Sequence, residues 1–533
     1  MRGLALPWLL GPLAIIGVAA AFRFWNLLGL PLFVDESLWL RWALNPYQYL
    51  PRGASPLQVL RVSLIGDVNP PLLHWILLAA LAWTDHPVWG ARAVTATCGT
   101  LAALGTYLLG TELFNRRVGA VAGLVHAVLP LAVFFDRLIH YDALTAMCVV
   151  YTAWLSARLA RHPSKQTAIA LGIMLAAAIV ANPRGATILP APALAFLLLR
   201  RAGSIRQSLV TFATSYAIAA LLAPLSFIGV PLDDVYKKIF GFGLTPGEML
   251  AAPTEMWDTN LALFRSWIEV YIGFDLLKLA VLGMLVMLVW RPRAGLYMLL
   301  LWLGLVLPFI LGGRQIYSRY LAVSAFPPSI AFAVLVVAAA WLPGAVASRL
   351  GLHQRPMAAV LGGALSMTTL MVGLTPPIQA SISMVTDPLH AHIPDSDRSQ
   401  YQDGWYAGVG VPEAAQYLLE VSRTTPLILL REDGMPGSGV HFYTYHAPNI
   451  RDAIEPALSL RGDNSVQRVR RWLEQSPNVY FVAIEDLSGE QPSRSRRFDE
   501  GLRGFPEAHR VAEFPSRDGD SRISVFKIEP RGG

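Results

Sequence analysis

Charged residues are scarce in this chain. Asp, Glu, Lys and Arg make up only 15% of its 533 residues, whereas hydrophobic residues make up 54% and the mean hydropathy is +0.45. Because soluble globular proteins carry about 25% charged residues, this composition excludes an ordinary soluble enzyme and indicates an integral membrane protein. The net charge of +7 does not indicate a nucleic-acid-binding protein, since Arg and Lys gather in short loops between apolar runs, as topology signals do.

Cysteines are also few, and the sequence shows no repeats or low-complexity blocks. The two cysteines, Cys98 and Cys148, both fall inside predicted membrane spans, so a disulfide framework is not indicated. Residues 1–22 resemble a signal peptide, because Ala19-Ala20-Ala21 looks like a cleavage site. A chain with many later spans more often keeps such a segment as an uncleaved anchor, and we expect an anchor here.

Long apolar runs recur through the first 380 residues and predict membrane-spanning helices. They lie at 5–22, 92–113, 119–135, 143–160, 166–181, 186–200, 207–228, 274–290, 295–311, 320–341 and 357–376. The loops between them alternate in charge, and the basic set is predicted to be cytoplasmic. This set comprises Arg116-Arg117, Arg158–Lys165, Arg200–Arg206, Arg291–Arg293 and Arg349–Arg355.

The other loops are predicted to face away from the cytoplasm. They are the acidic first loop, the turns at 136–142 and 182–185, the loops at 229–273 and 312–320, and everything after about residue 377. The apolar residues 71–84 do not fit, because counting them as a full span inverts every later loop. Two explanations stay open: a short re-entrant or interfacial helix, or a failure of the charge rule.

The sequence turns polar after about residue 395. Short apolar runs at 426–430 and 479–484 are typical of strands, and Pro412–Arg423 and Val466–Glu474 show helical patterns. This alternation of helix and strand predicts a small α/β domain. The tail contains no G-x-G-x-x-G, no Walker motif and no Cys/His cluster, so nothing in it suggests a cofactor site.

Two adjacent carboxylates, Asp35 and Glu36, lie just past the first apolar run. Charge near a bilayer is costly, so this pair is a candidate functional site. The segment around it is amphipathic and aromatic, as expected of helices in the membrane interface, with Phe24, Trp25, Phe33, Trp39, Trp42 and Tyr47. A carboxylate at this level can act as a general base toward an acceptor whose sugar donor is buried in lipid. Alternatively, the pair only marks the outer end of the first span.

Basic residues in the predicted outer turns could stabilise a departing phosphate. Guanidinium groups suit this task because they make forked contacts with phosphate oxygens. The candidates are Arg137, Arg184, Arg314, Arg319, Lys237 and Lys238, and Asp142 closes the turn that Arg137 opens. Any one of these turns alone is better explained by topology or local structure. Four such turns on one face favour a phosphate-binding role.

The sequence identifies no cofactor. His74 and His140 are possible metal ligands, but a lone histidine near a helix end is more often a hydrogen-bonded structural residue. Neither has another ligand at close spacing. A divalent cation therefore remains an open alternative without a motif to support it.

The order of these features resembles the GT-C glycosyltransferases. The chain has Asp35-Glu36 in the first outer loop, Asn69-Pro70-Pro71-Leu72 opening the next apolar stretch, the Arg137–Asp142 turn and a late Ser318-Arg319-Tyr320-Leu321. This order is similar to that of the bacterial protein-mannosyltransferase and lipid A aminoarabinose-transferase branch, which uses polyprenyl-phosphate sugars. The resemblance covers residues 5–380, and the tail matches only as a periplasmic α/β appendage.

The resemblance implies roles for particular residues. Asp35 would be the catalytic base, Glu36 its partner or a contributor to a metal site, and Asp142 part of the acceptor or sugar pocket. Relatives commonly carry a basic residue or His just before the Pro-Pro-Leu, whereas this chain has Asn69. The contact with the donor phosphate would therefore be weaker there or supplied by Arg184 and Arg319.

The predicted fold is mainly α. A polytopic transmembrane helical bundle of GT-C type, with about 11–13 spans, would occupy residues 1–380 with outer loops at 23–70 and 229–273. A small extracytoplasmic α/β domain would occupy residues 381–533.

The predicted activity is inverting transfer of one sugar from a polyprenyl-phosphate donor to an extracytoplasmic lipid, glycan or protein, at the outer face of a bacterial inner membrane. The expected partners are this donor, membrane lipid and the acceptor, but no nucleic acid. One alternative is a polytopic transporter or flippase, which would show internal repeats and broken helices at matching positions in two halves. The other is a catalytically inactive envelope scaffold, which would tolerate loss of Asp35.

Overall fold

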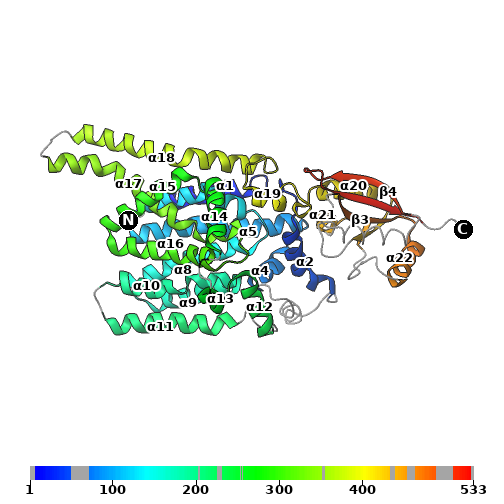
Figure 1. Ribbon diagram of the computed structural model, residues 1–533, viewed down its shortest axis with the longest axis horizontal. Coiled ribbons are helices and arrows are strands. Elements are labelled where there is room, and N and C mark those ends of the chain that lie inside the picture. Colours follow the sequence, from blue (N-terminus) through cyan, green and yellow to red (C-terminus); the bar gives the residue numbers. More distant parts are fainter. Residues whose placement is uncertain are drawn as a thin grey trace. The chain divides into compact units, whose positions relative to one another are not determined.

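The computed structural model describes residues 6–49, 71–201, 204–224, 231–251, 254, 256–350, 355–431, 439–452, 463–487 and 508–529. The chain forms two compact units, coloured along the sequence in Figure 1. Unit 1 consists of Met1–Asn26, Leu50–Ile76 and Ala93–Asp387, and unit 2 of Leu27–Tyr49, Leu77–Arg92 and Pro388–Gly533. Unit 2 is therefore assembled from three stretches that are far apart in the sequence.

Unit 1 is helical. Two helices, α4 (Pro71–Leu81) and α5 (Pro87–Leu113), belong partly to each unit. The others in unit 1 are α1 (Leu6–Phe24), α6 (Arg116–Val128), α7 (Pro130–Phe135), α8 (Tyr141–Arg161), α9 (Lys165–Ala181), η1 (Pro183–Ile188), α10 (Pro190–Leu199), α11 (Ile205–Leu222), α12 (Leu232–Phe242), α13 (Pro246–Ala251), α14 (Trp257–Tyr271), α15 (Phe274–Trp290), α16 (Pro292–Gly312), η3 (Ser318–Ser324), α17 (Phe326–Arg349) and α18 (Arg355–Thr386).

Many of these helices suit a bilayer. Among the described residues, six are long and apolar enough to cross one, and a seventh span results if α14 and α15 are counted together. Four more apolar helices are shorter, including α4 with its 11 residues. At 1.5 Å per residue, α4 is about half as long as a bilayer core is thick, which favours the short-helix explanation for residues 71–84.

Close helix packing in unit 1 depends on small residues. The long helix α17 packs against both α15 and α18 (Figure 1). A Cβ on Gly283 of α15 would lie 1.9 Å from the carbonyl oxygen of Ala331 in α17, and one on Gly362 of α18 would lie 2.0 Å from that of Ala340. Glycine at both positions lets the backbones approach closely, as is common where helices associate in membranes.

A sharp bend separates α14 from α15. The two helices meet at an angle of 101°. Gly273, between them, has φ +86° and ψ 129°, a region essentially restricted to glycine. This single residue therefore allows α14 to turn directly into α15.

A buried ion pair connects the first helix to the turn after α7. Arg23 at the end of α1 donates through Nε to Oδ2 of Asp136 at 2.9 Å, and both side chains are almost fully buried. The Arg23 Nη1 donates to the carbonyl oxygen of Ala127 at 2.9 Å. Gly99 of α5 lies so close that a Cβ there would be 2.1 Å from the Asp136 carboxylate. Removing either partner would leave the charge of the other buried and unpaired in the helical bundle.

Unit 2 contains a mixed five-stranded sheet in the order β2-β1-β3-β5-β4. The strands are β1 (Leu427–Arg431), β2 (Ile450–Asp452), β3 (Val479–Asp486), β4 (Ala508–Pro515) and β5 (Ser521–Ile528). The first three are parallel, and β5 runs antiparallel to both β3 and β4. The helices of unit 2 are α2 (Val34–Tyr49), α19 (Asp395–Tyr401), η4 (Trp405–Ala407), α20 (Val411–Thr424), α21 (Val440–Thr444) and α22 (Asp463–Gln475).

The sheet buries both of its faces. Alternate residues of β1 point to opposite faces. Leu429 lies in a core cluster with Leu418 of α20, whereas Ile428 and Leu430 lie in a second cluster against Trp472 of α22. These two layers give the α/β domain a core of its own.

The predicted fold class is confirmed. The described chain is mainly helical, with several apolar helices and a small C-terminal sheet, and the predicted strands and helices of the tail correspond to β1, β3, α20 and α22. Strands β2, β4 and β5 were not anticipated. The exact number of spans, the domain boundary at residue 380 and the extracytoplasmic position of the tail remain predictions.

Candidate functional site

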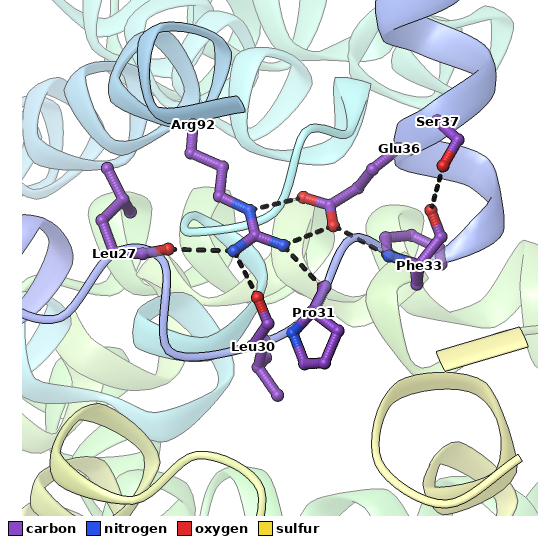
Figure 2. Close-up of polar contacts among 7 residues, drawn as sticks. All are labelled: Leu27, Leu30, Pro31, Phe33, Glu36, Ser37 and Arg92. Carbon is purple, nitrogen blue, oxygen red and sulfur yellow. Dashed lines mark hydrogen bonds and ion pairs between the residues drawn. The ribbon is translucent and has the colours of Figure 1, made fainter. Parts of the chain in front are cut away.

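Glu36 and Arg92 form a buried, forked ion pair in unit 2. Arg92 donates from Nε to Oε1 of Glu36 at 2.9 Å and from Nη2 to Oε2 at 2.6 Å. Its other three N–H groups donate to the carbonyl oxygens of Leu27, Leu30 and Pro31 at 3.0, 2.8 and 2.9 Å (Figure 2). All five guanidinium donors are thereby used, and the pair ties the segment before α2 to the start of α5.

The same pair organises the first turn of α2. Oε2 of Glu36 accepts a hydrogen bond from the backbone N–H of Phe33 at 3.3 Å, and Oγ of Ser37 donates to the carbonyl of Phe33 at 3.4 Å (Figure 2). Asp35 lies in this first turn, where a carboxylate is favoured by the helix dipole. It is partly exposed, whereas Glu36 is fully buried. The two adjacent carboxylates thus have different environments and can have different tasks.

The predicted residues Asp142, Arg184 and Arg319 come together in unit 1. Asp142 lies in the first turn of α8 and is 2% exposed. Its Oδ1 lies 3.4 Å from Nη2 of Arg184 in η1, and its Oδ2 lies 3.8 Å from Nε of Arg319 in η3. Asp142 and Arg319 are 177 positions apart in the sequence. Their common location is therefore a property of the fold.

Aromatic rings and a histidine complete this cluster. The guanidinium carbon of Arg184 lies 3.5 Å from the centre of the Tyr320 ring, and that of Arg319 lies 4.1 Å from the centre of the Tyr317 ring. His140 approaches Asp142 with its Nδ1 2.5 Å from Oδ2. Stacking on a ring holds a guanidinium in a defined plane while its N–H fork stays directed to one side.

The local sequence explains how Arg184 is held. Asn182 ends α9, and its side-chain oxygen accepts from the backbone N–H of Arg184 at 2.9 Å and from its Nε at 3.3 Å. Pro183 then begins the short η1 helix. A Cβ on Gly185 would be 2.0 Å from the carbonyl oxygen of Ala178, so glycine is required where η1 passes over the end of α9.

The other predicted phosphate contacts have different surroundings. Arg137 is buried and donates to the carbonyl oxygens of Met384, Trp25 and Asn26 at 2.7, 3.0 and 2.6 Å. Its guanidinium therefore joins the ends of α1 and α18, and its contact with the donor phosphate stays a prediction.

Arg314 and Lys237 are more exposed than the clustered arginines. Arg314 pairs with Glu248, with both side chains about two-fifths exposed, and its backbone N–H donates to the carbonyl of Phe242. Lys237 is 76% exposed and lies 3.8 Å from Asp234 on α12. The side chain of Lys238 and the whole of Asn69 lie outside the described residues.

Two contributions were missed at the level of sequence. Arg92 stands at the edge of an apolar run and was counted only as its first residue, although a lone charge at the edge of a span signals a buried partner. His140 was considered as a metal ligand or a hydrogen-bonded structural residue, without its partner Asp142. Within the described part of the chain, no group of three or more His, Cys, Asp or Glu side chains is arranged to hold a metal ion.

Comparisons with known proteins agree with this architecture. Residues 68–227 match the family model described as dolichyl-phosphate-mannose-protein mannosyltransferase. A crystal structure of ArnT from Cupriavidus metallidurans in the apo state superposes with a TM-score of 0.57 at 14% identity, and the form bound to undecaprenyl phosphate with 0.55 at 13%. Both alignments cover 98% of each chain.

A third structure has the same fold. Arabinofuranosyltransferase AftD from Mycobacteria superposes with a TM-score of 0.52 at 15% identity, over 99% of this chain and 40% of that one. A search of curated protein sequences found no match. The chain is a multi-span membrane protein with the GT-C fold, and the predicted resemblance to GT-C glycosyltransferases, including the ArnT-like branch, is confirmed.

Proposed function

We propose that this protein is a glycosyltransferase that moves one sugar from a polyprenyl-phosphate donor to an acceptor at the extracytoplasmic face of a bacterial inner membrane. The observation that carries the proposal is the cluster of Asp142, Arg184 and Arg319 in a GT-C fold. It brings two guanidinium groups to one carboxylate in a largely buried location. Such groups bind a phosphate in a forked manner and stabilise the charge that develops as it departs.

Asp142 has an orienting task in this proposal. A neighbouring carboxylate fixes the direction of a guanidinium, which carries five N–H donors in a planar fork. Arg184 is 19% exposed at its side chain, compared with 7% for Arg319. Arg184 would meet the incoming phosphate first, and Arg319 would hold it more deeply.

Asp35 is proposed as the general base. Its carboxylate takes the proton from the acceptor as the acceptor atom attacks the anomeric carbon of the donor sugar. The bond between that carbon and the phosphate oxygen breaks on the opposite side, and polyprenyl phosphate leaves with the electron pair. The anomeric configuration is inverted in this single displacement. Glu36 remains bound to Arg92 and keeps the first turn of α2 in place.

The relatives support the class of donor but not one sugar. The ArnT structure holds undecaprenyl phosphate, the matched family model is described by dolichyl-phosphate mannose, and AftD is an arabinofuranosyltransferase. Mannose and arabinofuranose are thus both associated with similar architectures, and the lipid carrier in the ArnT structure has no named sugar. We therefore leave the sugar and the acceptor unassigned.

The test is direct transfer by the purified protein. It would be reconstituted in liposomes with polyprenyl-phosphate donors that carry radiolabelled hexose, pentose or aminopentose, together with envelope extract as acceptor. Donor-dependent incorporation of label, lost in Asp35→Asn, is the expected result. A protein that incorporates no label from any of these donors, yet transports a lipid-linked sugar between leaflets, would favour a flippase instead.

A further inference from the structure

The segment that leads to Asp35 packs against the C-terminal part of unit 2. The ring of Phe33 meets the ring of Tyr401, at the end of α19, edge to face with 5.0 Å between centroids and 72° between planes. Both residues are 2% exposed. Edge-to-face pairs of this kind are stabilising beyond the burial of their area. Two residues before Asp35, the chain is therefore fixed by a ring from α19.

Two glycines let the C-terminal segment approach this closely. Gly408 has φ +72°, and a Cβ there would lie 2.2 Å from the carbonyl oxygen of Leu32. A Cβ on Gly439 would lie 3.4 Å from Oγ of Ser37 and 3.7 Å from Cδ2 of Leu32. Leu32 is itself fully buried. The C-terminal segment thus contacts the chain on both sides of Asp35.

Tyr443 links the same region to the core of the sheet. Its ring packs against the cluster that contains Leu418 and Leu429. Burial raises the pKa of Tyr443 to about 12, opposed by the nearby charge of Arg92 and reinforced by that of Glu36. One tyrosine therefore contacts the α/β core and lies close to the ion pair that organises α2.

We infer that the C-terminal α/β domain sets the position of Asp35, and that Tyr401, Gly408 and Tyr443 are positioning residues for the transfer reaction. The inference rests on the proposed function, because it concerns the proposed base. Under this inference the C-terminal domain contributes to the transfer reaction by holding the proposed base in place. A displacement of a catalytic group by about 1 Å can lower a rate by about 10²-fold, so small losses of support suffice to lower turnover.

Point variants test this role. Tyr401→Ala and Tyr443→Ala should each lower kcat by about 10- to 100-fold with little change in KM for the donor, because the base is misplaced while the donor-binding residues are intact. Tyr401→Phe should restore most of kcat, since its ring contact with Phe33 is kept. Gly408→Ala should resemble the alanine variants, because its Cβ meets the Leu32 backbone and its φ is positive.

A matched control separates positioning from stability. Trp472→Ala removes an aromatic side chain from the core cluster on the other face of the sheet, which does not include Tyr443. It should lower the thermal stability of the protein as much as Tyr401→Ala while leaving kcat unchanged. If Trp472→Ala and Tyr401→Ala reduced kcat equally, the domain would act only through overall stability, and the inference would be wrong.

A disulfide gives a measure of the contact that is independent of activity. Ser37→Cys with Gly439→Cys should form a disulfide in oxidising buffer, because a Cβ at position 439 lies 3.4 Å from the Ser37 Oγ. The native Cys98 and Cys148 are buried and are not expected to compete. The single variants serve as controls. The cross-linked protein should keep its turnover, and a recovery of turnover only after reduction would contradict a fixed support.

The two proposals can fail separately. If Asp35→Asn stays fully active, the proposed base is wrong whatever the tail does. If Asp35→Asn is inactive but the disulfide does not form and Tyr401→Ala keeps wild-type kcat, the transferase assignment stands and only the positioning role is overturned.

Discussion

Arg92 uses all five of its guanidinium N–H groups, and two of them grip Glu36 through Nε and Nη2. The side chains of both residues are at most 1% exposed. A buried pair of this geometry is stabilising only while both partners are present, since either charge alone would be stranded. The relationship gives the two neighbouring acids different environments: Glu36 is held in a buried pair with Arg92, whereas the side chain of Asp35 is partly exposed.

Breaking this pair should destabilise unit 2. Glu36→Gln and Arg92→Lys should each lower the free energy of unfolding by about 3–5 kcal/mol, because neither replacement can restore the forked contact between two charges. Thermal unfolding in detergent measures this. Arg398→Gln, which removes an exposed pair with Asp403, should cost less than about 1 kcal/mol. Equal melting temperatures for all three variants would contradict a structural role for Glu36.

Loss of the base should stop transfer without unfolding the protein. Asp35→Asn should lower kcat by about 10²–10⁴-fold, because the amide cannot accept the acceptor's proton. Its expression, melting temperature and donor binding should match those of the wild type. Asp85→Asn, at an acid whose side chain is 87% exposed in the same unit, is the control and should keep full activity. Near-normal turnover in Asp35→Asn would remove this residue from the mechanism.

Binding of the donor phosphate should depend on Arg184 and Arg319. Arg184→Gln and Arg319→Gln should each raise the concentration of polyprenyl-phosphate sugar needed for half-maximal rate by about 10- to 100-fold, since a hydrogen bond to a charged group contributes about 1.5–3 kcal/mol. Lys should rescue only in part, because it lacks the fork. Arg158→Gln, at a side chain that is 49% exposed beside Glu112, is the control. Unchanged donor dependence in both cluster variants would leave the phosphate without a binding site here.

The predicted orientation can be tested with cysteine labels, and the structure shows where to place them. Ser422 lies in the predicted outer domain but is buried, whereas Glu420 on the same helix is exposed. Ser204 caps α11, so the exposed Gln207 is the safer partner on the predicted cytoplasmic side. An impermeant thiol reagent added outside should modify Glu420→Cys and spare Gln207→Cys. The reverse pattern would invert the topology.

Hydropathy and charge were enough to predict the class of fold. Apolar runs such as 143–160 and 295–311 correspond to α8 and α16, because a bilayer requires long apolar helices whatever the rest of the chain does. Strand β3 could also be predicted, because its apolar run is short and bounded by turns. Strand β4 was not, because its residues are mostly exposed and read as polar.

The site was predictable only in part. The carboxylates and arginines were recognised by their order along the chain, which resembles that of a family, and Asp142, Arg184 and Arg319 do meet. The partner of Glu36 could not be found in this way. Arg92 is 56 residues away with no sequence period connecting the two, and such a pairing is set by tertiary packing alone. For the same reason the contacts of Tyr401, Gly408 and Gly439 with the Asp35 segment were not foreseen.

The discontinuity of unit 2 has a consequence for synthesis. Its first stretch ends at Tyr49, and its last begins only at Pro388, roughly 340 residues later. At about 5–20 residues per second, a ribosome needs on the order of 20 to 70 s to make what lies between. Throughout that interval Leu32 and Phe33 are present in the nascent chain, but the C-terminal tyrosines and glycines that contact them in the folded protein have not yet been synthesised. An insertion chaperone would have the longest opportunity to act at this segment, and a chain stalled before Pro388 would lack the residues that later contact Leu32 and Phe33.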